Sequence, residues 1–136
     1  MIKILLIDDD EELCTELGQV LEGEGFFVGT AFDGLKGLLH LQEEEYQIII
    51  LDLKLPGLSG FEVLKDLRKV DKHGKVIVLS GKPILAKSLR NNDGLSQEEE
   101  EKVLGLADMV VSKPFRVEDF IERVNHLAAS IVEKGQ

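Results

Sequence analysis

Five short apolar runs recur along the chain, and amphipathic stretches separate them. The runs are IKILLI (2–7), FFVGTA (26–31), YQIIIL (46–51), KVIVLS (75–80) and DMVVS (108–112). Most of them are rich in isoleucine, valine and leucine, with little alternation of apolar and polar residues. This pattern is typical of strands that are covered on both faces, as in a parallel sheet.

The stretches between the runs repeat their apolar residues with helical spacing. They predict helices at 11–23, 34–44, 60–70, 97–106 and 117–133. Asp10 is placed to cap the first helix, and Ser96 to cap the fourth, where Glu99 completes a capping box. The apolar residues of the second predicted helix are Leu35, Leu38, Leu39 and Leu41.

The alternation of strand and helix, five times over, predicts an α/β fold. Right-handed crossovers would place helices on both sides of one parallel sheet, which gives a (βα)5 three-layer sandwich. A chain of 136 residues is long enough for one hydrophobic core, so we expect a single domain over 1–136. In such folds ligands bind beyond the carboxyl ends of the strands.

Composition and charge exclude several functional classes. The chain has 16 Lys and Arg against 26 Asp and Glu, a formal net charge of −10, so we expect no direct binding to nucleic acid or to anionic membranes. Its single cysteine, Cys14, excludes a disulfide framework and a thiolate metal cluster. The first apolar run is too short for a signal peptide, and none approaches a membrane span, so we expect a cytoplasmic protein.

Polar side chains that can react or bind ligands follow four of the apolar runs. They are Asp8, Asp9 and Asp10 after the first run, Asp52 after the third, Ser80 and Gly81 at the end of the fourth, and Lys113 after the fifth. The carboxyl ends of parallel strands meet at one edge of a sheet. The sequence therefore predicts several carboxylates, a hydroxyl and an ammonium group around one crevice.

These residue types together suit phosphoryl transfer. Clustered carboxylates repel one another, and a hard divalent cation relieves the repulsion, with Mg²⁺ preferred and Mn²⁺ as a substitute. A carboxylate can also attack phosphorus and become an aspartyl phosphate. We therefore interpret Asp52 as a phosphate acceptor beside a metal on Asp8 and Asp9, with Ser80 and Lys113 neutralising charge.

At these positions the sequence resembles the receiver domain of two-component response regulators. ILLIDDDEEL resembles the acidic motif of that family, IIILDLKLPGLSGFEVL the phosphoacceptor motif, VIVLSG the hydroxyl-bearing fourth strand, and SKPF the lysine-proline motif. The likeness covers nearly the whole chain. It implies a flavodoxin-like fold with strand order 2-1-3-4-5.

The resemblance also implies partners and a ligand set. A sensor histidine kinase or phosphotransfer protein would phosphorylate Asp52, and the domain would regulate an output domain or protein, with a homodimer as one arrangement. Such a domain is a regulatory phosphoacceptor and not a conventional enzyme. Asp9 would bind Mg²⁺ directly, Asp8 at least through water, and the backbone carbonyl of Lys54 would be a further ligand.

Two features depart from the family pattern. The resemblance implies that Ser80, Gly81 and Lys113 bind phosphate oxygens and take part in a switch, which usually includes an aromatic residue three places before the lysine. Val110 stands there instead. Lys113 follows Ser80 by 33 residues, a longer span than the family usually shows, and the surplus lies in an extended segment at about 81–96.

Two other functions fit parts of the sequence. ILLIDDDEEL faintly resembles the motif of haloacid-dehalogenase-type phosphatases, with Asp8 as nucleophile and Asp10 as acid, but LDLKLPGLSG then has no explanation. The chain could also be a receiver-like interaction module that is never phosphorylated. The full set of acidic, hydroxyl and lysine residues argues against that reading.

Overall fold

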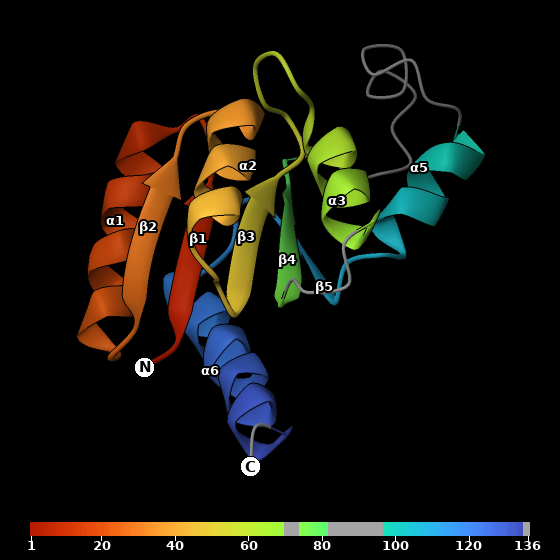
Figure 1. Cartoon of the computed structure of the whole chain (residues 1–136). Helices are drawn as coiled ribbons and strands as arrows, with labels where there is room; N and C mark the ends of the chain where they lie inside the picture. Colours follow the sequence, from red (N-terminus) through yellow and green to blue (C-terminus); the bar gives the residue numbers. More distant parts are fainter. Residues whose placement is uncertain (70–73, 82–96, 135–136) are drawn as a thin grey trace.

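The computed structural model describes residues 1–69, 74–81 and 97–134 (Figure 1). The elements are β1 (Lys3–Ile7), α1 (Glu11–Gly23), β2 (Phe27–Ala31), α2 (Gly34–Glu43), β3 (Ile48–Asp52), α3 (Gly60–Lys69), β4 (Lys75–Ser80), α5 (Gln97–Leu104), β5 (Met109–Ser112) and α6 (Val117–Lys134). The predicted elements are confirmed, with small differences at their ends. The predicted extension, beyond Gly81, and the cap at Ser96 lie outside the described residues.

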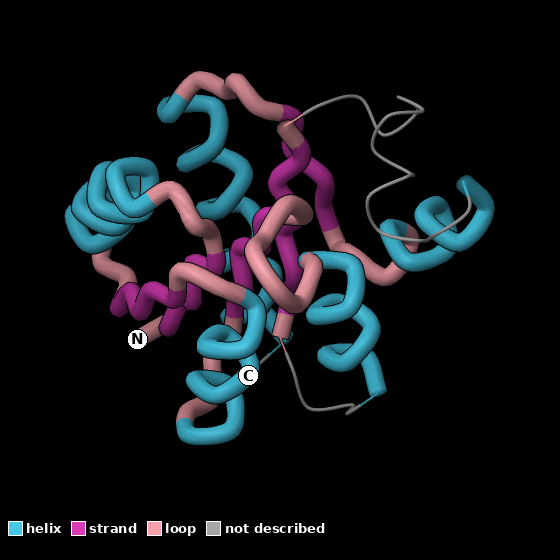
Figure 2. Tube along the Cα trace, turned by 90° about the horizontal axis from the view of Figure 1, so that it is seen from above, coloured by secondary structure: helices cyan, strands magenta, loops and turns pink. Residues whose placement is uncertain are grey.

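The strands form one parallel sheet in the order β2-β1-β3-β4-β5, as predicted. Helices α1 and α6 cover one face of this sheet, and α2 and α3 cover the other (Figure 2). The strands point upward in Figure 1, so their carboxyl ends lie together at the top of the molecule. The three-layer α/β sandwich is therefore confirmed.

The core lies in two layers because successive strand residues point to opposite faces of the sheet. Leu6 belongs to the cluster that contains Leu17 of α1 and Phe120 of α6. Ile7, the next residue of the same strand, belongs to the cluster that contains Leu64 of α3. All the residues of β3 are buried, which explains the nearly unbroken apolar run before Asp52.

Helix α5 is attached to the α3 side of the sheet. Its Val103 is buried in the same cluster as Leu64. The side chain of Arg68, near the end of α3, donates hydrogen bonds to the carbonyl of Leu106 at 3.0 Å and to Asp108 Oδ2 at 2.8 Å. Arg68 therefore ties the end of α3 to the corner between α5 and β5.

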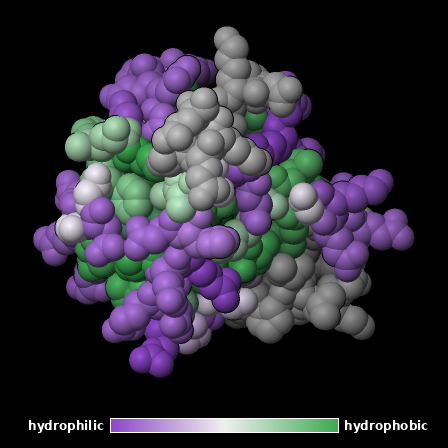
Figure 3. Space-filling model, turned by 90° about the horizontal axis from the view of Figure 1, so that it is seen from below, coloured by the Kyte–Doolittle hydropathy of each residue, from purple (hydrophilic) through white to green (hydrophobic). Residues whose placement is uncertain are grey.

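Some apolar residues on the predicted helices are not in the core. Val20 of α1, and Leu35 and Leu39 of α2, are exposed. The buried face of each helix is therefore narrower than its apolar residues alone suggest. Seen from below, apolar areas of the surface alternate with hydrophilic ones (Figure 3).

The start of α3 packs unusually close to the end of β3. A Cβ atom at Gly60 would lie 2.3 Å from the carbonyl oxygen of Asp52 and 2.5 Å from the Cα of Leu53. Both neighbours are backbone atoms, so a side chain at Gly60 would displace the segment that carries Asp52. This glycine therefore sets how closely α3 approaches the strand end.

We predict that Gly60→Ala lowers the free energy of unfolding by roughly 1–3 kcal/mol, because the added methyl overpacks a backbone contact. Gly23→Ala is the matched control, since a Cβ at Gly23 would meet nothing within 4 Å. Alanine favours helix there, so the control should be neutral or slightly stabilising. Urea unfolding followed by circular dichroism measures both, and equal effects would contradict the close approach.

Candidate functional site

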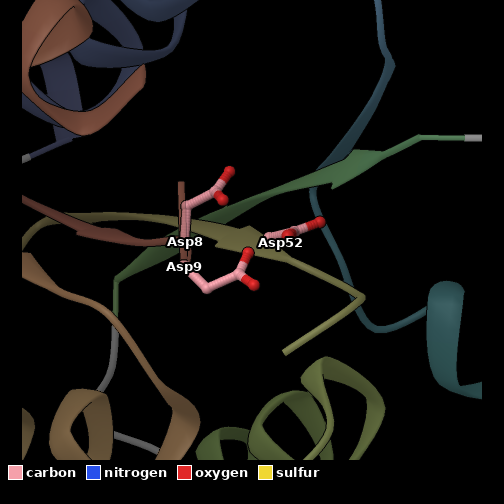
Figure 4. A group of neighbouring side chains, drawn as sticks. All are labelled: Asp8, Asp9 and Asp52. Atoms are coloured by element: carbon pink, nitrogen blue, oxygen red, sulfur yellow. The ribbon is translucent and has the colours of Figure 1, made fainter. Parts of the chain in front are cut away.

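Three carboxylates from two strand ends meet at the top of the sheet (Figure 4). Asp52 is the last residue of β3, and Asp8 and Asp9 directly follow β1. One oxygen of each residue lies within 4.8 Å of the others. Asp8 and Asp52 are only 2% and 5% exposed, whereas Asp9 is exposed. The structure thus brings together the acidic residues that the sequence singled out.

The ammonium group of Lys113 sits beside the two buried carboxylates. Its Nζ lies 2.9 Å from Asp8 Oδ2 and 3.8 Å from Asp52 Oδ1. The backbone N–H of Lys113 donates to the carbonyl of Ser80 at 2.7 Å, which holds the end of β5 next to the end of β4. Lys113 therefore offsets part of the negative charge, mainly through Asp8.

Backbone groups hold the carboxylates in place. The N–H of Asp10 donates to Asp8 Oδ1 at 3.0 Å, and the N–H of Lys54 donates to Asp52 Oδ1 at 3.3 Å. Asp10 itself caps α1, since its Oδ1 accepts from the N–H of Leu13 at 3.1 Å. The predicted cap is therefore confirmed, and the carboxylate of Asp10 is already engaged there.

The crowding changes the acidity of the groups. Burial and the charge of Asp8 raise the pKa of Asp52 to about 7, although Lys113 and the Lys54 N–H act in the opposite direction. Burial acts to lower the pKa of Lys113, but its hydrogen bond to Asp8 and the charge of Asp52 raise it, so the ammonium stays charged. Burial and Asp8 raise the pKa of Cys14 to about 12, so its thiol stays protonated.

The donor set suits a hard divalent cation. Among the described residues, three carboxylates share the one ammonium group of Lys113, so these side chains keep an excess of negative charge, and the ligand atoms that the carboxylates offer are oxygens. Mg²⁺ binds such oxygens and tolerates water in its remaining positions. Elsewhere in the described ranges, no second group of three or more candidate metal-binding side chains comes together.

The remaining predicted residues lie around this cluster. Ser80 is buried at the end of β4, and the exposed Gly81 follows it. Gly81 and Lys113 line a hollow of about 480 Å³. Its other walls are Asp10, Leu13, Glu16, Pro114, Phe115 and Val117.

The apolar wall of this hollow was missed in the sequence analysis. Phe115 directly follows the lysine-proline pair, and its ring stacks on that of Phe120 with 4.9 Å between centroids. Phe115, the apolar residue that ends the SKPF motif, is the feature of the sequence that could have indicated this wall. Val110 is half-buried against the cluster on the α3 side, where its short side chain takes the place expected for an aromatic ring.

The family model of the response regulator receiver domain matches residues 4–125. The chain belongs to this family, and the function predicted from the resemblance is confirmed at the level of a receiver domain, which is a regulatory domain. The acidic cluster fits the phosphoacceptor site of such a domain. The phosphatase alternative has no support from these comparisons.

Individual relatives agree with this assignment. The chain is 39% identical over 127 residues to the transcriptional regulatory protein CpxR homolog of Haemophilus influenzae, covering 91% of this chain and 49% of that protein. The Francisella response regulator 1452 receiver domain superposes with a TM-score of 0.78 at 29% identity, covering 96% of this chain and 99% of that one. The response regulator TrrA of Thermotoga maritima was solved in complex with Mg²⁺–BeF. It superposes with a TM-score of 0.73 at 31% identity, covering 93% of this chain and 99% of that one.

The chain spans about half the length of the curated relatives it matches. Those proteins are named as transcriptional regulators. Among the residues that the structure describes, no helix is long and apolar enough to cross a membrane.

We predict that Asp52→Asn stabilises the chain in the presence of a metal chelator. The folded state holds a proton on Asp52 up to about pH 7, whereas the unfolded state releases it near pH 4. The contribution of Asp52 to the free energy of unfolding therefore falls as pH rises from about 4 to 7. The stabilisation by Asp52→Asn should grow over that window and reach at most about 4 kcal/mol above it.

Thermal unfolding with and without Mg²⁺ measures this effect. Asp66→Asn is the matched control, because it removes a carboxylate at the surface of α3, away from the acidic cluster. Saturating Mg²⁺ should shrink the difference, because the cation stabilises the wild-type cluster. A destabilised Asp52→Asn protein at pH 8 in chelator would contradict the account of carboxylate crowding.

Proposed function

We propose that Asp52 accepts a phosphoryl group from a histidine of a sensor kinase or phosphotransfer protein, and that phosphorylation regulates an output domain or protein. The observation that carries this proposal is the convergence of Asp8, Asp9 and Lys113 on a buried Asp52 at the carboxyl edge of the sheet. Mg²⁺ is the proposed cofactor. Asp8, Asp9, Asp52 and the backbone carbonyl of Lys54 are its proposed ligands.

The proposed reaction transfers a phosphoryl group from an imidazole nitrogen of the donor histidine to a carboxylate oxygen of Asp52. A carboxylate oxygen of Asp52 attacks the phosphorus as the bond to the donor imidazole breaks, and the imidazole keeps the electron pair. Bound Mg²⁺ would neutralise charge on the transferring oxygens. Lys113 Nζ lies 2.9 Å from Asp8 Oδ2, and in the phosphorylated state it would pair with a phosphoryl oxygen instead. Ser80 is the proposed further phosphate-binding residue.

Several findings support this proposal. TrrA, a relative with the same fold, was solved with Mg²⁺–BeF. Burial and the charge of Asp8 raise the pKa of Asp52, and a bound cation would lower that pKa again, which supports a metal beside this carboxylate. The carboxylate of Asp10 is engaged in capping α1, which disfavours the acid role that the phosphatase alternative assigns to it.

We further propose how the domain is used. Residues 1–136 act as one receiver domain in the cytoplasm, where an unpaired cysteine such as Cys14 stays reduced. The net charge of −10 disfavours nucleic-acid binding by this domain, so the output lies in another segment or protein. Val110 cannot provide the ring of the usual switch, so phosphorylation is transmitted through Ser80, Gly81 and Lys113.

We predict that a small phosphodonor such as phosphoramidate adds one phosphate to the chain when Mg²⁺ or Mn²⁺ is present. Intact-mass spectrometry should show the adduct with metal and none with chelator, because only a cation relieves the carboxylate repulsion. Asp52→Asn should abolish the adduct, and Asp66→Asn should leave it unchanged. An adduct that survives in Asp52→Asn and maps to Asp8 would support the phosphatase alternative instead.

We predict that Asp9→Ala weakens Mg²⁺ binding about tenfold or more, through loss of one anionic ligand. Asp10→Ala should leave the affinity nearly unchanged and lower the free energy of unfolding by about 0.5–2 kcal/mol, because it removes the cap of α1. Calorimetric titration and urea unfolding separate the two effects. If Asp10→Ala removes metal binding and Asp9→Ala does not, the proposed ligand set is wrong.

A further inference from the structure

The exposed apolar side chains are concentrated in one stretch of the chain. Among the described residues, eight large apolar side chains are exposed, and four of them lie between residues 27 and 39. They are Phe27, Phe32, Leu35 and Leu39. We refer to Phe32, Leu35 and Leu39, on α2 and just before it, as the α2 face. Leu35 is 62% exposed and Leu39 is 48% exposed.

Leu35 and Leu39 are not part of either core cluster. Helix α2 packs on the sheet through other residues, including the buried Leu41 and the close contact of Gly37 with Ile7. Leu35 and Leu39 are four residues apart, so they lie one turn apart on the same stripe of the helix. Two exposed leucines on one stripe of a helix offer a partner adjacent apolar contacts that the core of this chain does not use.

The surroundings of the α2 face indicate what covers it. Glu43 lies one further turn along the stripe, and Glu43 and Glu45 are both exposed. Glu44 between them already pairs with Lys3. The basic side chains within α2 are Lys36 and His40, and neither forms an ion pair with Glu43. The apolar stripe therefore ends beside two exposed carboxylates that form no ion pair with a described residue.

A second copy of this chain does not fit the surface. Two copies would bring together the same glutamates on chains that each carry a net charge of −10. The exposed apolar area of three side chains is a few hundred Å², whereas a stable interface buries about 800 Å² per partner. The area suits a short segment, and the charge suits a basic one.

We propose that the α2 face binds a short amphipathic segment of a partner protein, which places two apolar side chains on Leu35 and Leu39 and basic side chains near Glu43 and Glu45. This is the recognition of an amphipathic helix through anchors one turn apart. The α2 face lies on the layer opposite α1 and α6, whose residues line the hollow beside Lys113 (Figure 2). Binding there therefore leaves the hollow open, and the proposal does not depend on phosphorylation of Asp52.

Photo-crosslinking in the native host identifies the partner. Leu39 is replaced by p-benzoylphenylalanine in the full-length protein, and the same replacement at the exposed Val20 of α1 is the control. We expect a cross-link from position 39, absent from position 20, to a basic amphipathic segment of another protein. Mass spectrometry of the cross-linked peptide reports that sequence.

A synthetic peptide with that sequence then tests the contacts by fluorescence anisotropy. The pair Leu35→Gln and Leu39→Gln should weaken its binding about tenfold or more, because half-exposed leucines are buried on binding. The control pair Val20→Gln and Leu106→Gln removes two other exposed apolar side chains, away from α2, and should have no effect. Glu43→Gln with Glu45→Gln should weaken binding about threefold, and added salt should do the same.

Circular dichroism of each variant confirms that the fold is intact. The proposal is overturned if position 39 cross-links only to a second copy of this chain, only to lipid, or to nothing beyond the control. It is also overturned if the captured segment is acidic, or if Leu35→Gln with Leu39→Gln leaves the peptide affinity unchanged.

Discussion

Repulsion between carboxylates at one edge of a parallel sheet is the constraint around which this structure is organised. The chain direction of β1 and β3 brings Asp8, Asp9 and Asp52 within 4.8 Å, and among the described residues the ammonium group of Lys113 compensates their charge only in part. Backbone N–H groups at Asp10 and Lys54 hold the two buried carboxylates without neutralising them. The residual charge of these side chains is the physical basis of the proposed metal site.

The core keeps this unfavourable cluster in place. Both faces of the sheet are covered, so β3 is buried along its whole length and Asp52 cannot move away from Asp8 without disrupting two apolar clusters. Gly60 lets α3 begin directly against the carbonyl of Asp52. Hydrophobic burial in the two layers thus offsets the electrostatic cost at one end.

The fold was predictable because apolar residues repeat with different spacing in strands and in helices. The site was predictable because the carboxyl ends of parallel strands lie at the same edge of the sheet. Those rules were sufficient to place Asp8, Asp52 and Lys113 together. They could not show that Lys113 lies closer to Asp8 than to Asp52, since a difference of 2.9 Å against 3.8 Å depends on loop geometry. Nor could helical periodicity show that Leu35 is exposed, because it does not fix the width of the buried stripe.

The loop that follows Asp52 also contacts the start of α2, the helix that carries Leu35 and Leu39 of the α2 face. The loop from Asp52 to Gly60 packs against the start of α2, where a Cβ at Gly34 would lie 2.5 Å from the carbonyl of Leu58. A side chain at Gly34 would have no room there, so any movement of this loop would have to be accommodated at the start of the helix that carries Leu35. Linkage is reciprocal: if phosphorylation changes the affinity of the α2 face for a partner, that partner changes the phosphorylation equilibrium by the same factor.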